Sequence, residues 1–453
     1  MGLGHDATRK IGRVKVQDAK AALASVGRAL AGINSKANLL DDVAWSRETE
    51  ERFFADEEKL PVVSYRIDRP TFEKELAALR AIERDVEGDG PIPRWLRGTI
   101  ASHVDRLRLL LAVGSREFGV VSREVYGGAS SCFFGLSLSN LDLARHLRER
   151  LAMHGWDARR EAELAPMNAD DLVAFLEGRI AKRRLPVKVV LDPDCTSKAI
   201  AGMKRIRVRP DATFTSWEAE GLYRHEVETH ACTALNGAEQ EHAAFLKSGG
   251  PRSTPTQEGL AVFSELYHHA LAVPRLRRLV LRVEMVAMAE DGASFLDVYR
   301  FLRDEHGMAP RDAYLDTSRV FRGGLVEGGA PFTKDACYLA GLVEVHAFLA
   351  AFVRAGFRDE CEMVVCGRFA LEDIAALVEL RAMGILSRPR WRPRWLREWD
   401  TLLPYFAFAS FLDDVDLAPV EARYADVIRI AGRARAPGAG APDAALTAPS
   451  RRR

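Results

Sequence analysis

The stretch His225-Glu226-Val227-Glu228-Thr229-His230 decides the interpretation of this chain. Two histidines at positions i and i+4 of a helix, with a glutamate after the first, form a common zinc site. In that site the histidines bind the metal and the glutamate acts as general base. Here the spacing is i and i+5, which puts the histidines roughly 140° apart around a regular helix. Because a π-helical turn accommodates one extra residue, the spacing predicts a widened turn between His225 and His230.

The flanking residues predict a strand, a short loop and a helix. Met203 to Arg209 alternates apolar and basic residues as a strand does, and Pro210 ends it. Thr215-Ser-Trp-Glu218 has the pattern of a capping box, so a helix begins there and runs to Asn236-Gly237. This order is that of zincin-type hydrolases, in which the strand pairs with extended substrate beside the metal.

A third metal ligand is expected, because catalytic zinc keeps three protein ligands and one open position. Thr254 and Gln257 are suited to cap a helix that starts at Pro255 and ends near Ala270. Glu258 then lies in the first turn of this helix. The pattern predicts a zinc site with a base and three ligands: Glu226, and His225, His230 and Glu258.

Two features of this site stay open. Glu265 and His269 lie on the same helical stripe as Glu258, and Glu265 is a candidate partner of the ligands. In a regular helix Glu226 and His230 would themselves be i, i+4 neighbours and form a plain side-chain pair. The alternative to a metal site is therefore an ordinary helix.

Together these motifs resemble a known family. The hexapeptide at 225–230, followed by Thr256-Gln-Glu-Gly-Leu-Ala261, resembles the bacterial QEGLA-motif family, named for modulation of flavohaemoglobin expression. Its eukaryotic relatives are the microtubule-associated tyrosine carboxypeptidases. The resemblance covers roughly residues 35 to 400, through blocks at Trp45–Tyr65, Phe118–Gly127, Arg319–Tyr338 and Phe369–Leu386. It implies the same zinc ligands and base, with Tyr or Phe as the leaving residue. Glu228 stands where the eukaryotic branch has glycine, and it adds negative charge near the metal.

A second candidate region is the glycine-rich loop within Arg319–Tyr338, where four glycines and one proline fall within nine residues. A carboxypeptidase must hold a free α-carboxylate. Arginine does so with a two-pronged hydrogen bond, lysine as a point charge, and a tyrosine can donate to an oxyanion. The candidates for substrate binding are Arg319, Arg322, Lys334 and Tyr338. The alternative is a solvated surface loop before a helix.

Composition favours an intracellular enzyme. The 453 residues are 47% hydrophobic and 28% charged, with a formal net charge of +1, which gives no reason to expect nucleic-acid or membrane partners. The six cysteines form no Cys-x-x-Cys pair and are read as reduced thiols. The N-terminal residues lack the apolar stretch of a secretory signal, and no run of about 18 apolar residues is apparent. A cytoplasmic location without a membrane span is expected.

The chain reads as a mainly helical α+β protein with a zincin-like core and a short antiparallel sheet. Helical spacing covers Asp68–Val86, a break is expected at Pro91–Pro93, Asn168 begins a helix, and Pro186–Leu191 is a strand. The expected divisions are a flexible N-terminus (1–14), an N-terminal helical region (15–113), a metallopeptidase core (114–345), a C-terminal helical region (346–433) and a disordered tail (434–453).

The sequence therefore predicts a zinc-dependent metallocarboxypeptidase that releases a C-terminal Tyr or Phe from a protein or peptide. The alternatives are a non-catalytic metal-binding regulatory protein, a zinc endopeptidase, or a helical scaffold without metal. Neither the natural substrate nor the oligomeric state follows from these patterns.

Overall fold

The computed structural model describes residues 15–33, 38–56, 58–133, 136–153, 166–195, 197–412, 416, 418–423 and 425. The expected flexible N-terminus (1–14) and disordered tail (434–453) lie outside these residues. The chain divides into two compact units, 1–399 and 400–453. The expected boundaries at 113/114 and 345/346 lie inside the first unit and stay predictions.

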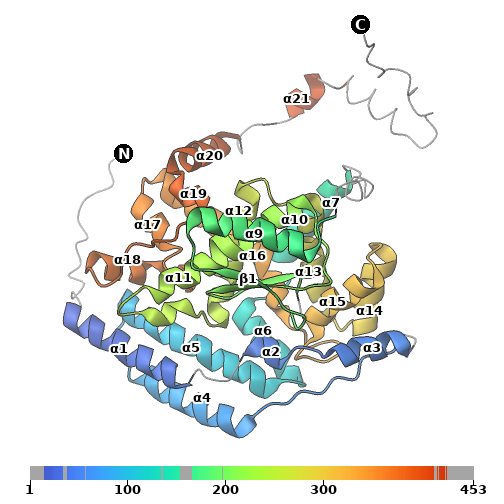
Figure 1. Cartoon of the computed structure of the whole chain (residues 1–453), viewed down its shortest axis with the longest axis horizontal. Helices are drawn as coiled ribbons and strands as arrows, with labels where there is room; N and C mark the ends of the chain where they lie inside the picture. The colour runs from blue at the N-terminus through green and yellow to red at the C-terminus, as the bar shows by residue number, and fades with distance from the viewer. Residues whose placement is uncertain are drawn as a thin grey trace. The chain divides into compact units, whose positions relative to one another are not determined.

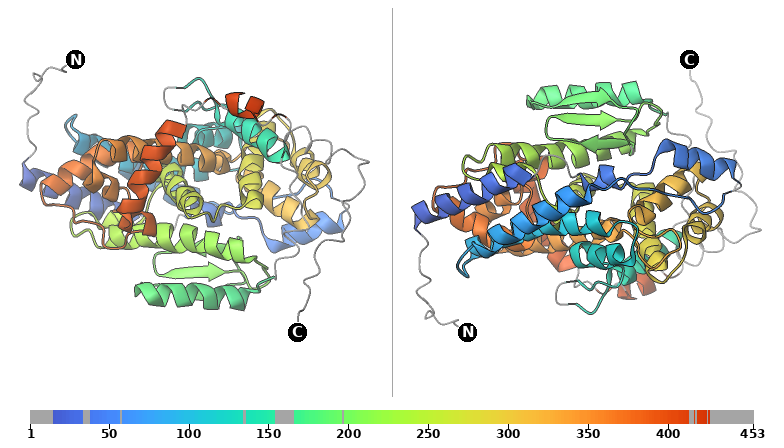
Figure 2. Two further views of the ribbon diagram at one scale, coloured as in Figure 1. Left: turned by 90° about the horizontal axis from the view of Figure 1, so that it is seen from above. Right: turned by 90° about the horizontal axis from the view of Figure 1, so that it is seen from below.

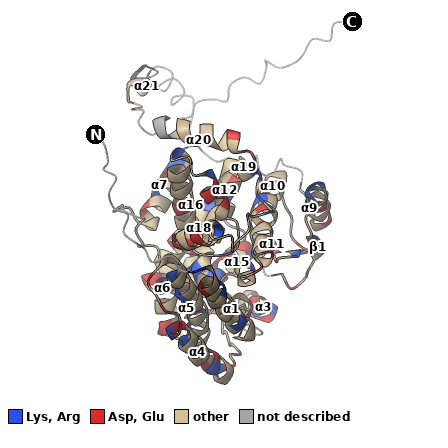
Figure 3. Cartoon of the chain, turned by 90° about the vertical axis from the view of Figure 1, so that its left-hand side faces the viewer, with Lys and Arg blue, Asp and Glu red and all other residues tan. Residues whose placement is uncertain are grey.

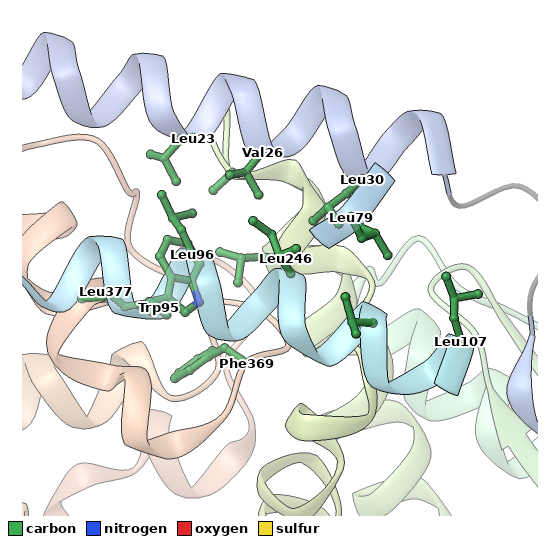
Figure 4. Packing of buried hydrophobic residues seen from close by; sticks show 14 of the residues in the cluster. Leu23, Val26, Leu30, Leu79, Trp95, Leu96, Leu107, Leu246, Phe369 and Leu377 are labelled. Atoms are coloured by element: carbon green, nitrogen blue, oxygen red, sulfur yellow. The ribbon is translucent and has the colours of Figure 1, made fainter. Parts of the chain in front are cut away.

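The N-terminal part of the first unit is a layer of helices around α5. Leu23, Val26 and Leu30 of α1 pack in one apolar cluster with Trp95 and Leu96 of α5 (Figure 4). The expected break at Pro91–Pro93 is wrong: α5 begins there, because a proline in the first turn lacks only an N–H that has no helical partner anyway. The elements are α1 (Val16–Ile33), α2 (Leu39–Asp42), α3 (Arg47–Ala55), α4 (Arg69–Arg84), α5 (Pro91–Ala112), α6 (Arg116–Tyr126) and α7 (Asn140–Met153).

The sheet has three strands in the order β1-β3-β2. They are β1 (Lys188–Leu191), β2 (Ala199–Ala201) and β3 (Arg205–Val208). β1 runs parallel to β3, and β2 runs antiparallel to it. The prediction of an antiparallel sheet is therefore wrong in part. β2 folds back on β3 through the short turn at 202–204 and lies on the side of β3 away from β1, which leaves β1 and β3 running the same way.

This sheet lies between two helical layers (Figure 2). One is α9 (Ala169–Arg183), which starts at Asn168 with a capping box, as expected. The other is a continuous helix of three parts: α10 (Ser216–Leu222), η1 (Tyr223–Ala231) and α11 (Cys232–Ala238). Apolar side chains of all three layers, among them Leu176, Ile206 and Val227, form one core.

The rest of the first unit surrounds α12 and α16, which pack side by side near the centre of Figure 1. A second apolar core joins α13, α14, α15 and the start of α16. The elements are η2 (Ala244–Lys247), η3 (Pro251–Ser253), α12 (Thr254–Tyr267), α13 (Val273–Glu290), α14 (Phe295–Arg300), η4 (Phe301–Glu305), α15 (Pro310–Phe321), η5 (Thr333–Ala336), α16 (Cys337–Arg354), α17 (Arg358–Met363), η6 (Leu371–Asp373), α18 (Ile374–Ala382) and α19 (Arg394–Arg397). α20 (Trp399–Leu412) belongs to the second unit from its second residue, and α21 (Ala418–Arg423) belongs to it entirely.

One helical stretch of the described residues, Thr333–Arg354, is long and apolar enough to cross a membrane by length and composition alone. Its mean hydropathy reaches 1.8 over an 18-residue window, although Glu344 and His346 interrupt the apolar residues. In this structure 44% of that window is buried, and the helix packs against α12. Charged residues of both signs are interspersed on helices such as α4 and α5 (Figure 3), and over the whole chain they sum to a formal net charge of +1.

Candidate metal and substrate site

The widened turn predicted from the histidine spacing is present. Residues Tyr223–Ala231 form a π-helix between two α-helical segments. The ring centroids of His225 and His230 lie 4.8 Å apart, with the ring planes at 85°. Both histidines therefore lie on one side of the helix despite the i, i+5 spacing, and the ordinary-helix alternative does not apply.

Glu258 lies opposite the two histidines. Its Oε2 is 3.3 Å from Nε2 of His225 and 3.5 Å from Nε2 of His230. Ligands about 2.0–2.1 Å from a tetrahedral zinc ion stand about 3.3–3.4 Å from one another. Oε2 is buried and accepts no hydrogen bond in the described structure. These three side chains, whose candidate ligand atoms all lie within 4.8 Å of one another, could hold a metal ion.

Glu265, two turns of α12 beyond Glu258, contacts a histidine as predicted. Nδ1–H of His225 donates to Oε1 of Glu265 at 2.6 Å, which leaves Nε2 directed at the candidate metal position. Arg275 holds both oxygens of Glu265, with Nε and Nη2 each at 3.2 Å. His269 takes no part in this contact; it follows the end of α12 with a left-handed φ of 55°.

The charges of this group favour ionised carboxylates. Burial opposes the charge on Glu258, but Lys334 and the two histidines hold the pKa of its carboxyl well below the usual range. Burial also opposes the charge on Glu265, and Arg275 lowers its pKa. Burial lowers the pKa of His225, but the neighbouring carboxylates of Glu258 and Glu265 outweigh this and raise it to about 10. A metal ion bound there would displace that proton.

Glu226 is held by the sheet. The backbone N–H of Ala201 in β2 donates to Oε2 of Glu226 at 2.7 Å. β3 has neighbours on both sides, so the prediction that this strand pairs with substrate is wrong. The edge strand beside Glu226 is β2, which sequence patterns did not reveal because it has only three residues. Pairing of Ala199 with Val208 places its peptide groups on the same outer edge as those of Ala201.

Glu228 does not add charge at the metal position. Its carboxylate is 1% exposed, and it accepts from Arg183 at 2.8 Å and from Arg224 at 2.6 Å. It is not among the residues that line the cavity described below. Two guanidiniums balance the negative charge that Glu228 was expected to add near the metal.

The start of α12 differs from its predicted capping. Thr254 is the first helical residue, Ser253 precedes it without a side-chain cap, and Oε1 of Gln257 accepts from Thr233 instead. Within the 256–261 motif, the residue with a clear structural reason is Gly259. A Cβ there would lie 2.2 Å from the carbonyl oxygen of Gly341 in α16. This close contact between helix backbones brings Glu258 beside the first turn of α16.

The three cations of the 319–338 region, Arg319, Lys334 and Arg322, differ in their partners. Nε and Nη2 of Arg319 donate to Asp335 at 2.5 and 2.9 Å, so this arginine is already paired. Nζ of Lys334 lies 3.3 Å from Oε1 of Glu258 and 3.5 Å from the Tyr338 hydroxyl. Arg322 differs: its Nε is buried and has no partner, and it forms no ion pair among the described residues. Burial, with Arg319 nearby, lowers the pKa of Arg322 to about 10.

The glycine-rich loop packs against residues of the N-terminal part of the chain. Gly323 has a φ of +81°, and a Cβ there would lie 2.4 Å from the ring of Phe118. Its N–H donates to the hydroxyl of Tyr65, which also accepts from Trp45. The blocks at Trp45–Tyr65 and Phe118–Gly127 therefore contact the loop at Gly323, the residue after Arg322.

One cavity of about 1230 Å³ joins these groups. Its walls include β2, the two histidines, Glu226, Glu258 and all four predicted substrate residues. It also includes residues that sequence analysis missed, such as Arg275, Arg282 and Arg368. A family alignment could reveal them, but their spacing carries no local signal.

Comparison with known proteins identifies the family of this chain. Residues 51–414 match the family model described as microtubule-associated tyrosine carboxypeptidase. The chain therefore belongs to this family, and the QEGLA-motif resemblance is confirmed. Human microtubule-associated tyrosine carboxypeptidase 1 is 26% identical over 216 residues, which are 45% of this chain and 42% of the relative. Mouse putative tyrosine carboxypeptidase MATCAP2 is 25% identical over 207 residues, 43% of this chain and 37% of the relative. The matches span less than half the length of these relatives.

Proposed function

We propose that this protein is a zinc-dependent carboxypeptidase with a zincin-like core, which releases a C-terminal Tyr or Phe from a protein or peptide. The observation that carries the proposal is the convergence of His225, His230 and Glu258 in one cavity with Glu226. Family membership supports the carboxypeptidase activity.

The chemistry divides between metal and protein. A zinc ion on the three ligands would supply Lewis-acid catalysis and lower the pKa of water. Glu226, which is not in the ligand group, would take the proton of the attacking water and return it to the leaving amine. The N–H of Ala201 orients the carboxylate of Glu226 for this role.

Substrate would bind along the free edge of β2. The outward peptide groups of Ala199 can pair with an extended peptide, whereas the N–H of Ala201 is already bonded to Glu226. Arg322 is our first choice for the terminal carboxylate, because its guanidinium lacks an acid in the described structure. Lys334 is the second choice, since it already pairs with Glu258. Tyr338 remains a candidate oxyanion donor.

The test uses two peptides that end in Tyr, identical except that one C-terminus is the free acid and the other the amide. We expect zinc-loaded protein to release Tyr from the free acid with a kcat/KM at least roughly tenfold above that for the amide. A charged hydrogen bond to the carboxylate contributes about 1.5–3 kcal/mol. Mass spectrometry of the products gives both rates, and Arg322→Ala should remove the difference.

Other outcomes identify the alternatives. Equal cleavage of both peptides would indicate an endopeptidase. Bound zinc without turnover of any member of a C-terminal peptide library would indicate a non-catalytic metal-binding regulator. An exposed-residue variant, Glu241→Gln, serves as the control for handling and metal loading.

A further inference from the structure

Arg368 occupies a position at the cavity that neither the motifs nor the proposed mechanism uses. It lies in the loop between α17 and η6, where its backbone N–H donates to the carbonyl oxygen of Leu246 at 2.8 Å. Its Nη2 donates to the backbone carbonyl of the candidate ligand His230 at 3.3 Å. The guanidinium is thereby fixed beside the histidines, and the residue lines the cavity.

The charge of Arg368 is not balanced within the described chain. Two other buried cations of the cavity are paired, Arg275 with Glu265 and Arg319 with Asp335. Arg368 forms no ion pair, and its Nε is buried without a hydrogen-bond partner. Leaving a guanidinium in this condition is costly unless an anion arrives during function.

Glu258 and Glu226 are the acids whose charges act on Arg368, and they belong to the candidate site. Neither carboxylate pairs with Arg368 in the described structure. Arg368 lines the same cavity as the candidate metal ligands and the proposed base, and its guanidinium is bonded to the backbone of His230. That cavity is where the oxygen of a peptide carbonyl would acquire negative charge.

We propose that Arg368 is a further catalytic residue, which donates a hydrogen bond to the scissile carbonyl oxygen as its negative charge develops. The inference rests on the proposed function. Water oxygen bonds to the carbonyl carbon, the carbonyl π electrons move to the oxygen, and Glu226 takes the water proton. The C–N bond then breaks, its electron pair stays on nitrogen, and Glu226 returns the proton to that nitrogen. Arg368 stays protonated throughout and is held in place by His230, so it needs no reorganisation.

The first test compares Arg368→Gln with the unmutated protein on a Tyr-terminated free-acid peptide. We expect kcat to fall roughly 10²- to 10³-fold, the loss typical of one oxyanion donor, with KM nearly unchanged. Zinc content should stay the same, because the histidine rings keep their other contacts. Added guanidinium ion should partly restore the turnover of Arg368→Ala.

A second readout does not depend on turnover. A phosphinic peptide, whose tetrahedral anion resembles the transition state, should bind zinc-loaded Arg368→Gln more weakly by the same factor as kcat/KM, measured by calorimetry. Arg368→Lys keeps the charge and should recover part of this binding. Arg381→Gln removes the same charge from α18, outside the cavity lining, and should bind like the unmutated protein.

The possible failures are distinct. If the unmutated protein cleaves the peptide and Arg368→Gln cleaves it equally fast, the role of Arg368 is wrong and the proposed function stands. Loss of zinc in a folded Arg368→Gln would mean that Arg368 only positions His230. If the unmutated protein cleaves nothing, the proposed function fails; unchanged phosphinate binding in Arg368→Gln would then overturn the Arg368 assignment as well.

Discussion

Glu226 and Glu258 are carboxylates of one cavity with different surroundings, and these surroundings assign their roles. Glu226 accepts from the backbone N–H of Ala201 and is absent from the group of possible ligands. Glu258 faces both histidines through an oxygen that accepts no hydrogen bond. A base must bind and release protons, whereas a ligand must stay deprotonated.

Substitution of each glutamate should therefore have a different effect. Glu226→Gln should retain zinc and lose most of its kcat, because only the base is removed. Glu258→Ala should lose zinc together with activity. Metal analysis beside initial-rate measurements separates the two, and wild-type turnover by Glu226→Gln would refute the mechanism.

Glu265 should act through His225 rather than on substrate. Its carboxylate fixes the ring by accepting from Nδ1–H, and Arg275 fixes the carboxylate. Loss of such a partner weakens metal binding roughly 10- to 100-fold. We expect that loss of zinc affinity for Glu265→Gln in a competition titration with a chelator. An unchanged affinity would show that the contact is only structural.

At the scale of elements, the helix α10–η1–α11 is fixed at both ends, on either side of its π-helical centre. Thr215 and Glu218 form the expected capping box at the start. At the other end Gly237 is not a left-handed stop: a Cβ there would lie 2.4 Å from the backbone of Leu246. Asn236 is 1% exposed and binds the chain at Val365 and Trp391.

Asn236 should therefore be important for stability. Its amide donates to two carbonyl groups and accepts from the N–H of Trp391, so Asn236→Ala leaves three polar groups without a partner. Each costs about 1–3 kcal/mol when buried, and we expect unfolding to become easier by at least about 2 kcal/mol. Chemical denaturation measures this. Asn168→Ala, which removes only the cap of α9, should cost about 1 kcal/mol.

At the scale of the whole first unit, Asp335 connects three helices through charge. It accepts from Arg319 of α15, lies 3.6 Å from Arg282 of α13, and belongs to the 3-10 turn before α16. Burial opposes its charge, but these arginines hold its pKa well below the usual value of 3.8. A lowered folded-state pKa contributes stability above pH 3.8, and this contribution is lost as the pH falls below that value.

The unfolding temperature should accordingly fall when the pH drops below about 4. Asp335→Asn should be less stable at neutral pH by about 3–5 kcal/mol, because it leaves buried arginines without their acid. Its unfolding temperature should also change less between pH 4 and pH 2, since part of the acid sensitivity is removed. Calorimetry across this range tests both effects; parallel curves for the two proteins would contradict the assignment.

The features that sequence alone determined are local. The i, i+5 histidines predict the π-helix, Thr215 and Asn168 predict helix starts, and the apolar alternation at 203–209 predicts β3. Each depends on residues a few positions apart, whose side chains and backbone meet whatever the rest of the chain does. The grouping of His225, His230 and Glu258 was predictable too, because a catalytic zinc site needs a third ligand and Glu258 was expected in the first turn of the next helix.

Only the tertiary structure decided which distant groups meet. The order β1-β3-β2 makes β2 an edge strand, and its Ala201 meets Glu226 across 25 residues of sequence. Arg368 meets His230 across 138 residues. Arg319 and Arg322 are three residues apart in the chain, yet of the two only Arg319 forms an ion pair with Asp335 in the described structure. Such contacts depend on how whole layers pack, because an ion pair forms only where the fold brings opposite charges together.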